Sequence, residues 1–261
     1  MKISQYPLYQ LDTDLKTPFV IDDGVSIVNN KVILGKRNIA NLAKKDKKHI
    51  KEAEFCLSIN HNMISPIKAS ALFMLSCRLL KRTKIFIRYH INENNEVLQI
   101  IDRYPYVTAW NATTQIKHNE FKKLKKIYCG IKNFQSLNIR ASNATYFLFM
   151  AYRSKSWLES LIFHVCAIET LTSNVKRESK ITKKFVNRVH NFTGYNKQRL
   201  EKIYNIRSEL VHGRYNSKDT KKHLILNRTA ESACRKMFVR ILLDSNNIKA
   251  FINDSSRLKL F

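Results

Sequence analysis

Apolar residues recur every three or four positions through the second half of the chain, which is the spacing of one face of an α-helix. This spacing predicts helices over residues 144–152, 157–172, 178–192, 197–211 and 221–244. The first of these segments is apolar nearly all round, so we expect it to be buried on every side. A helical bundle is therefore predicted from residue 136 to the C-terminus.

The first half of the chain mixes helical and strand patterns. Apolar and polar residues alternate over 84–91. A polar turn follows, and a second strand-like run covers 96–101, so the two runs predict a β-hairpin. Pro66, with Ser65 before it, predicts the start of a helix over 66–81. The first thirty residues indicate loop and short strands, and further short strands are expected at 25–28, 31–34 and 55–59.

The predicted fold class is α+β, organised in two parts. Residues 1–135 form a mixed α/β N-terminal region, to which the sequence assigns no role. Residues 136–261 form an all-α helical bundle, and every residue with a chemical pattern around it lies there.

Two charged residues lie where the predicted helices should be apolar. Arg207 falls in the middle of the apolar stripe of helix 197–211, and Glu169 falls within the stripe of helix 157–172. A buried guanidinium is tolerated when a carboxylate pairs with it, whereas either charge alone is costly. We therefore expect Glu169 and Arg207 to form an ion pair. Such a pair either only locks the helices together or also directs part of the guanidinium toward a phosphate, and the sequence leaves both readings open.

The charge balance favours a polyanionic partner. The chain has 47 Lys and Arg residues against 20 Asp and Glu, a formal net charge of +27. A bias toward Lys, Asn and Ile would explain part of this excess, but such a bias normally raises Glu as well, and acidic residues are scarce. Nucleic acid is the polyanion that we expect this surface to bind.

Other features narrow the class of protein. The five cysteines are widely spaced and form no Cys-x-x-Cys pair, which indicates neither a zinc site nor a disulfide scaffold. The N-terminus lacks the apolar core of a signal peptide, and no uncharged apolar run approaches the ~20 residues of a membrane span. No acidic cluster has the spacing of metal ligands, so no metal or other cofactor is expected. These features predict a cytoplasmic protein without a membrane segment.

The run IYNIRSELVHG, residues 203–213, resembles the signature of the HEPN superfamily, in which an Arg is followed after four residues by a His on a late helix. It is most similar to the Apea-like branch, whose members carry a Tyr-x-x-Arg-Ser-x-x-x-His-Gly run. The matching residues are Tyr204, Arg207, Ser208, His212 and Gly213. An upstream block, HVCAIETLTS, resembles the earlier helix of that branch at Ile168, Glu169 and Leu171. The resemblance covers residues 136–245.

The resemblance implies a metal-independent endoribonuclease that acts as a homodimer on RNA, with tRNA among the candidate substrates. By analogy it also implies a toxin or an effector of antiviral defence against phage. In this reading Arg207 and His212 are catalytic, and Glu169, Ser208 and Tyr204 support them. Basic residues of the bundle would contact the nucleic acid: Lys183, Lys184, Arg188 and Arg214. Other members of the superfamily bind nucleic acid or regulate a partner protein without catalysis, and both roles stand as alternatives.

The implied chemistry suits the two side chains. RNA supplies its own nucleophile, the 2′-OH, so an enzyme needs only to move protons and to stabilise charge on phosphorus. An imidazole titrates near neutral pH, and a guanidinium can hold two phosphorane oxygens at once. His212 fills only one of the two proton-transfer roles, and the resemblance implies that a second chain supplies the other. Ser208 stands where many HEPN nucleases carry Asn or Asp.

Overall fold

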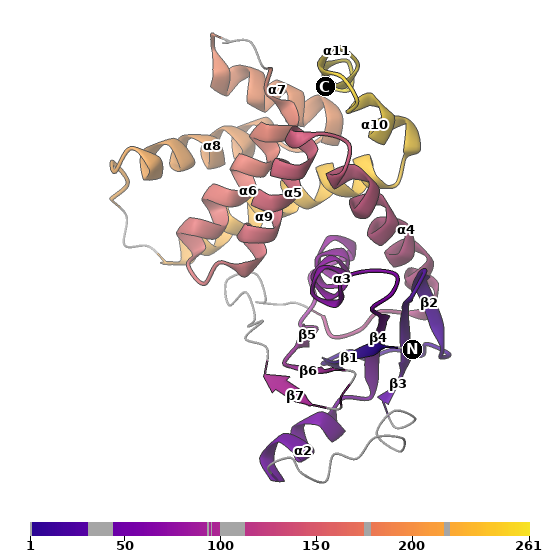
Figure 1. Ribbon diagram of the computed structural model, residues 1–261. Helices are drawn as coiled ribbons and strands as arrows, with labels where there is room; N and C mark the ends of the chain where they lie inside the picture. Colours follow the sequence, from indigo (N-terminus) through magenta and orange to yellow (C-terminus); the bar gives the residue numbers. More distant parts are fainter. Residues whose placement is uncertain are drawn as a thin grey trace. The chain divides into compact units, whose positions relative to one another are not determined.

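The computed structural model describes residues 2–30, 44–92, 94, 96–99, 113–174, 179–216 and 220–261, and it has an α+β fold (Figure 1). The predicted fold class is therefore confirmed: an antiparallel sheet lies in the N-terminal part, and helices make up the C-terminal part. The described residues divide into two compact units at the junction of Cys129 and Gly130. This junction lies inside α4 (His118–Gln135), six residues before the predicted boundary after residue 135.

The N-terminal unit is built on one antiparallel sheet. Within the described residues its strands follow the order β2-β3-β4-β1-β6-β7, and β5 pairs with the C-terminal end of β1. The strands are β1 (Ile3–Tyr9), β2 (Phe19–Asp22), β3 (Val25–Asn29), β4 (Phe55–Asn60), β5 (Phe86–Ile87), β6 (Tyr89–Ile91) and β7 (Val97–Gln99). The predicted hairpin is present, with Tyr89 opposite Gln99 and Ile91 opposite Val97. The strand expected at 31–34 lies outside the described residues.

The central strand, β1, is longer than the sequence predicted. Its sequence ISQYPLY contains polar residues and a proline, yet Ser4 through Tyr9 are all buried. Neighbouring strands supply partners for the buried hydroxyl of Ser4: Nε2 of His61 lies 2.5 Å away and Nε2 of His90 lies 2.7 Å away. Because a hydroxyl carries one proton, it donates to one imidazole and accepts from the other. This cross-strand bonding allows a polar segment to occupy the middle of the sheet.

Two helices of the N-terminal unit bear out the pattern in part. α3 (Pro66–Leu80) begins at the predicted proline, with Ser65 as its N-cap residue. Ile67, which was expected on its buried face, is 75% exposed, and burial begins at Ala69. α2 (Lys44–Glu52) contains the charged run that follows residue 43.

The C-terminal unit is a helical bundle around α6 (Figure 1). α6 (Trp157–Thr172) packs against α5 (Ile139–Arg153), α7 (Ile181–Thr193), α8 (Lys197–Val211) and α9 (Thr220–Leu242). The bounds of α6 and α8 match the predicted ranges, because both helices begin behind residues whose side chains accept a hydrogen bond from the first turn. These N-cap residues are Ser156 and Asn196.

Three details of the predicted burial are wrong. α5 is not buried on every side, since Tyr146 is 57% exposed. The helical spacing also predicts that Ile181 and Val211 point inward, but each is 53% exposed. Ile181 is the first residue of α7 and Val211 the last of α8, so both lie at helix ends, whereas Tyr146 lies in the middle of α5 on a face that is open to solvent.

The C-terminal segment docks onto the bundle. α10 (Ser245–Ala250) and α11 (Asp254–Leu258) follow α9, and the ring of Phe261 packs edge-on against Phe192 and Phe251. All five cysteines lie in described segments, and each is a free thiol. Throughout the described ranges, no helix combines the length and the apolar character that crossing a membrane requires.

The fold predicts that Gly130 cannot carry a side chain. Gly130 lies inside α4, and a Cβ atom placed there would come within 2.7 Å of the carbonyl oxygen of Leu242. We expect Gly130→Ala to lower the free energy of unfolding by about 1–3 kcal/mol, even though alanine favours helix more than glycine does. Urea denaturation would measure this change, with the exposed Lys126→Ala in the same helix as the control. An unchanged or raised stability of Gly130→Ala would show that α4 and α9 do not approach this closely.

Candidate functional site

The crossing of α6 and α8 brings Glu169 and Arg207 together. Oε2 of Glu169 lies 2.7 Å from Nη2 of Arg207, so the predicted ion pair is confirmed. α8 presents Arg207 on the face that also buries Leu200, Ile203 and Tyr204. The charge therefore lies on the inner face of the helix, and the carboxylate of the neighbouring helix neutralises it.

The pair is less buried than the sequence predicted. The side chains of Arg207 and Glu169 are 23% and 21% exposed, so the pair lies at the edge of the bundle core. This position follows from the exposed last turn of α8, because Val211 and His212 have no neighbouring helix over them. A ligand in solvent can consequently reach the guanidinium without opening the bundle.

Arg207 keeps part of its hydrogen-bonding capacity. Its Nη2 atom is shared by Glu169 and by the thiol of Cys166, whose Sγ atom lies 3.8 Å away. Its Nε atom is buried without a hydrogen-bond partner, and Nη1 makes no hydrogen bond with any described residue. Burial lowers the pKa of Arg207, but the charge of Glu169 and the contact with Cys166 outweigh it and raise the pKa above its ordinary value. The residue is a permanent cation with unused donors.

Tyr204 completes the inner side of this cluster. Its ring packs against Phe185 at 4.7 Å between centroids. Burial, followed by the nearby Glu169 carboxylate, raises the pKa of the phenol to about 12, so Tyr204 stays protonated at neutral pH. Burial also raises the pKa of Cys166, and Arg207 opposes this shift. Neither group is an anion that would compete with a phosphate for Arg207.

His212 lies at the end of α8, outside the bundle. It is the C-cap residue, its backbone N–H donates to the carbonyl of Ser208 at 3.0 Å, and Gly213 follows with a left-handed φ of +67°. His212 is exposed, and the end of α8 extends beyond the neighbouring helices in Figure 1. His212 follows Arg207 by five positions, which places it about 140° around and roughly 7.5 Å along the helix. Within the described residues no hydrogen bond joins the two side chains, so one chain does not bring them into direct contact.

The predicted nucleic-acid-binding residues have different environments. Lys183 and Arg214 are exposed, and Lys184 is partly exposed. The guanidinium of Arg188 makes a hydrogen bond within the bundle, because its Nη1 donates to the carbonyl oxygen of Thr172 at 2.9 Å. Ser208 is partly buried and contributes its backbone carbonyl to His212.

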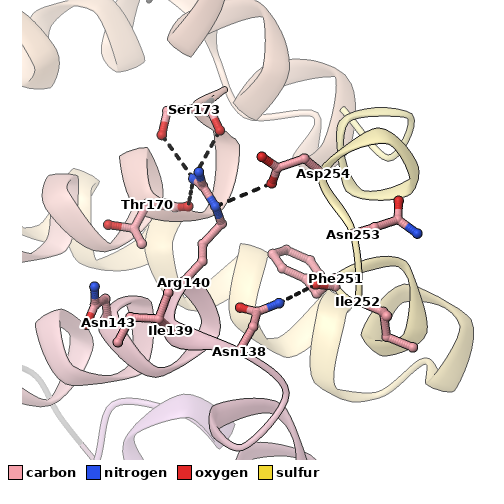
Figure 2. Close-up of a pocket in the computed structure, with 10 residues that line it drawn as sticks. All are labelled: Asn138, Ile139, Arg140, Asn143, Thr170, Ser173, Phe251, Ile252, Asn253 and Asp254. Carbon is pink, nitrogen blue, oxygen red and sulfur yellow. Dashed lines mark hydrogen bonds and ion pairs between the residues drawn. The ribbon is translucent and has the colours of Figure 1, made fainter. Parts of the chain in front are cut away.

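The end of α6 that carries Glu169 is held by arginines that the sequence reading did not single out. Figure 2 shows Arg140 reaching from α5 to the carbonyl oxygen of Thr170 at 2.9 Å and to both oxygens of Ser173. Arg257 of α11 is fully buried and donates to the carbonyl oxygens of Leu171 at 2.5 Å and Ser173 at 2.8 Å. These guanidiniums, with Arg188, satisfy carbonyls that a helix end leaves without partners. A lone Arg in a first turn or a tail carries no sequence signal for such a role.

Asp254 balances this arginine cap. Its Oδ1 atom lies 2.9 Å from Nη2 of Arg257 and 3.5 Å from Nε of Arg140. Burial lowers the pKa of Arg257, and the neighbouring charges of Arg140 and Arg188 add to that effect, whereas the hydrogen bond that Arg257 donates to Asp254 opposes it. A pocket of about 500 Å³ opens beside the cap, lined by Asn138, Ile139, Arg140, Asn143, Thr170, Ser173, Phe251, Ile252, Asn253 and Asp254. One cation and one anion line it, so it has no preference for a charged ligand.

A second hollow, of about 390 Å³, lies between α8 and α9. Its charged lining residues are all cations, namely Arg199, Lys202, Lys221 and Lys222. The sequence reading missed this groove, because its two walls are separated along the chain by the loop after α8. Elsewhere in the described part of the chain, no three His, Cys, Asp or Glu residues gather where they would hold a metal ion.

Comparison with known proteins identifies no relative: no protein-family model, no curated protein and no solved structure matches the chain. The site must therefore be interpreted from its own geometry.

The geometry predicts how the ion pair contributes to stability. In Glu169→Ala the partly buried Arg207 cation loses its carboxylate. We expect the free energy of unfolding to fall by about 1–2 kcal/mol. This value lies between the small contribution of an exposed ion pair and the roughly 3–5 kcal/mol lost when a fully buried pair is broken. Chemical denaturation would measure it, with the exposed Glu209→Ala on α8 as the matched control, expected within about 0.5 kcal/mol of the parent chain. Equal midpoints for the two variants would mean that the pair does not hold α6 to α8.

Proposed function

We propose that this protein is a metal-independent endoribonuclease of HEPN type, with Arg207 and His212 as its catalytic residues. The observation that carries the proposal is the state of Arg207. Glu169 fixes one arm of its guanidinium through Nη2, Nη1 makes no hydrogen bond with any described residue, and the side chain is 23% exposed. A fixed guanidinium with unused donors suits two oxygens of a phosphate or phosphorane.

The proposed reaction needs only proton transfer and charge stabilisation. The 2′-oxygen of a ribose attacks the adjacent phosphorus, and its proton passes to a neutral imidazole. The P–O5′ bond then breaks, and the leaving 5′-oxygen takes a proton from an imidazolium. The products are a 2′,3′-cyclic phosphate and a 5′-hydroxyl end, and Arg207 stabilises the negative charge that builds on the phosphoryl oxygens between these steps.

Two imidazoles serve this reaction better than one, and this supports a homodimer. His212 lies on an exposed helix end, without a hydrogen bond to Arg207 of its own chain. Around a two-fold axis the same patch meets itself, so two exposed α8 ends would bring two His212 side chains and two Arg207 side chains to one cleft. In such a cleft one imidazole acts as base and the other as acid.

A non-catalytic nucleic-acid-binding role is the second candidate. The observation that favours it is the separation of Arg207 and His212 within one chain, because an isolated chain would hold a phosphate without cutting beside it. RNA is the common partner of both candidates. A possible role as a toxin or antiviral effector rests on the family resemblance alone.

Cleavage in the presence of EDTA tests the proposed activity. Purified protein incubated with total RNA or tRNA should produce fragments ending in 2′,3′-cyclic phosphate. His212→Ala and Arg207→Lys should each lower the rate about 100-fold or more, since one loses the proton carrier and the other the bidentate fork. His118→Ala, which removes an exposed imidazole elsewhere, should cleave at the parent rate. Activity that requires added Mg²⁺, or that persists undiminished in His212→Ala, would exclude this mechanism.

Mixed dimers test the composite site. When increasing proportions of His212→Ala chain are mixed with wild-type chain, activity should fall more steeply than the fraction of wild-type chain does. The reason is that each mixed dimer loses one of its two imidazoles. The comparison is the same titration with His118→Ala chains, which should leave the activity proportional to total protein. Sedimentation of a fully active monomer at micromolar concentration would contradict the composite site.

A further inference from the structure

The groove between α8 and α9 has an unusual charge composition. Arg199 and Lys202 form one wall, and Lys221 and Lys222 form the other. Ile225, Leu226 and Thr229 are the other described residues of the lining, and none of the described lining residues is a carboxylate. Arg199, Lys202 and Lys221 are exposed, and their side chains make no ion pair or hydrogen bond with any described residue.

The cations also lie where helix electrostatics disfavours them. Lys221 and Lys222 are the second and third residues of α9, and Arg199 is the third residue of α8. The first turn of each helix contains no acidic residue. Helix N-termini carry partial positive charge and stabilise anions, so a cation in the first turn typically costs about 0.3–1 kcal/mol. The contacts among the described residues give no reason for Arg199 and Lys221 at these positions, whereas a bound anion would.

The neighbouring basic pocket is a useful contrast. It has about 440 Å³ between α7 and α8 and contains Lys180, Lys183 and Lys197, but Glu201 lies among them. Arg188, farther along α7, is held by the end of α6. The surface between α7 and α8 is thus partly neutralised by Glu201, whereas the described lining of the α8–α9 groove contains no carboxylate.

We infer that the α8–α9 groove binds the phosphate backbone of single-stranded RNA. The choice of RNA as the polyanion rests on the proposed function. Two walls of cations can contact successive phosphates. Among the described residues no aromatic side chain lines the groove, so they offer no platform for stacking bases. Contacts of this kind position a strand without reading its sequence.

The groove and Arg207 lie on different faces of α8. Arg207 lies about 12 Å beyond Arg199 along the helix axis, and Lys202 lies about 140° around the axis from Arg207. Arg207 is not among the described residues that line the groove. The groove is therefore a separate surface of the same helix, and its proposed role is to supply affinity for the substrate.

Salt-dependent RNA binding tests the inference. A fluorescently labelled single-stranded RNA is titrated in EDTA with full-length His212→Ala protein, so that cleavage does not interfere, and anisotropy is recorded between 50 and 400 mM salt. The groove variant adds Arg199→Gln, Lys202→Gln and Lys221→Gln. The matched control adds Lys180→Gln, Lys197→Gln and Lys259→Gln, which removes the same charge from exposed positions outside the groove. Circular dichroism melting verifies that both variants are folded.

We expect the groove variant to bind roughly 100-fold more weakly near 0.1 M salt and to reduce the slope of log K against log salt by about 2, as the loss of three phosphate contacts predicts for a single strand. The control should change binding by no more than about three-fold, because none of its three lysines lines the groove. Equal weakening in both variants would overturn the inference, as would unchanged binding by the groove variant. Binding of the wild type to phosphatidylserine vesicles but not to RNA would overturn it as well.

The wild-type cleavage assay separates this inference from the proposed function. If the groove variant loses RNA binding and the wild-type chain fails to cleave RNA, the groove stands and the nuclease does not. If a chain with the three groove substitutions and an intact His212 cleaves at the parent rate, the nuclease stands and the groove is excluded.

Discussion

The ion pair between Glu169 and Arg207 is the interaction on which the arrangement of the bundle depends. A guanidinium on the inner face of α8 would be costly without a carboxylate from another helix, so the pair fixes the position at which α8 crosses α6. The rest of the bundle supports this crossing. Arginines from α5, α7 and α11 hold the end of α6 just beyond Glu169, while Asn196 defines the start of α8. The ion pair is thus held from both helices, which gives the remaining donors of Arg207 a fixed direction.

Cations of the C-terminal unit lie at both kinds of helix end, and the electrostatics of the two ends differ. At the end of α6, cations meet carbonyl groups, an arrangement that stabilises the helix. At the starts of α8 and α9, cations meet partial positive charge, an arrangement that does not. The first group has a structural explanation in the contacts that it makes. In the second group, Arg199 and Lys221 make no such contact with any described residue.

The sequence predicted most where local rules and burial agree. The ranges of α6 and α8 and the contact between Glu169 and Arg207 follow from periodicity, from caps, and from the cost of an unpaired charge on a buried face. Prediction failed where segments distant in the sequence determine whether a residue is buried. β1 is buried although it contains Ser4, Gln5 and Pro7, because strands from elsewhere supply its partners. Val211 has the spacing of a core residue but lies beyond the end of its neighbours. The α8–α9 groove joins two walls that no local pattern relates.

One helix carries all the components that the proposed reaction needs, and its geometry limits what a single chain can do. A straight helix turns about 100° per residue, so Arg207 on the inner face and His212 five residues later cannot both point inward. The bundle therefore orients Arg207, whereas nothing in the described part of the same chain orients His212. Catalysis needs both groups fixed to within a fraction of an ångström. If the protein cleaves RNA, a surface outside the bundle must orient the exposed turn from Val211 to Gly213. A second copy of the same turn is the partner that the two-fold symmetry of ordinary dimers provides.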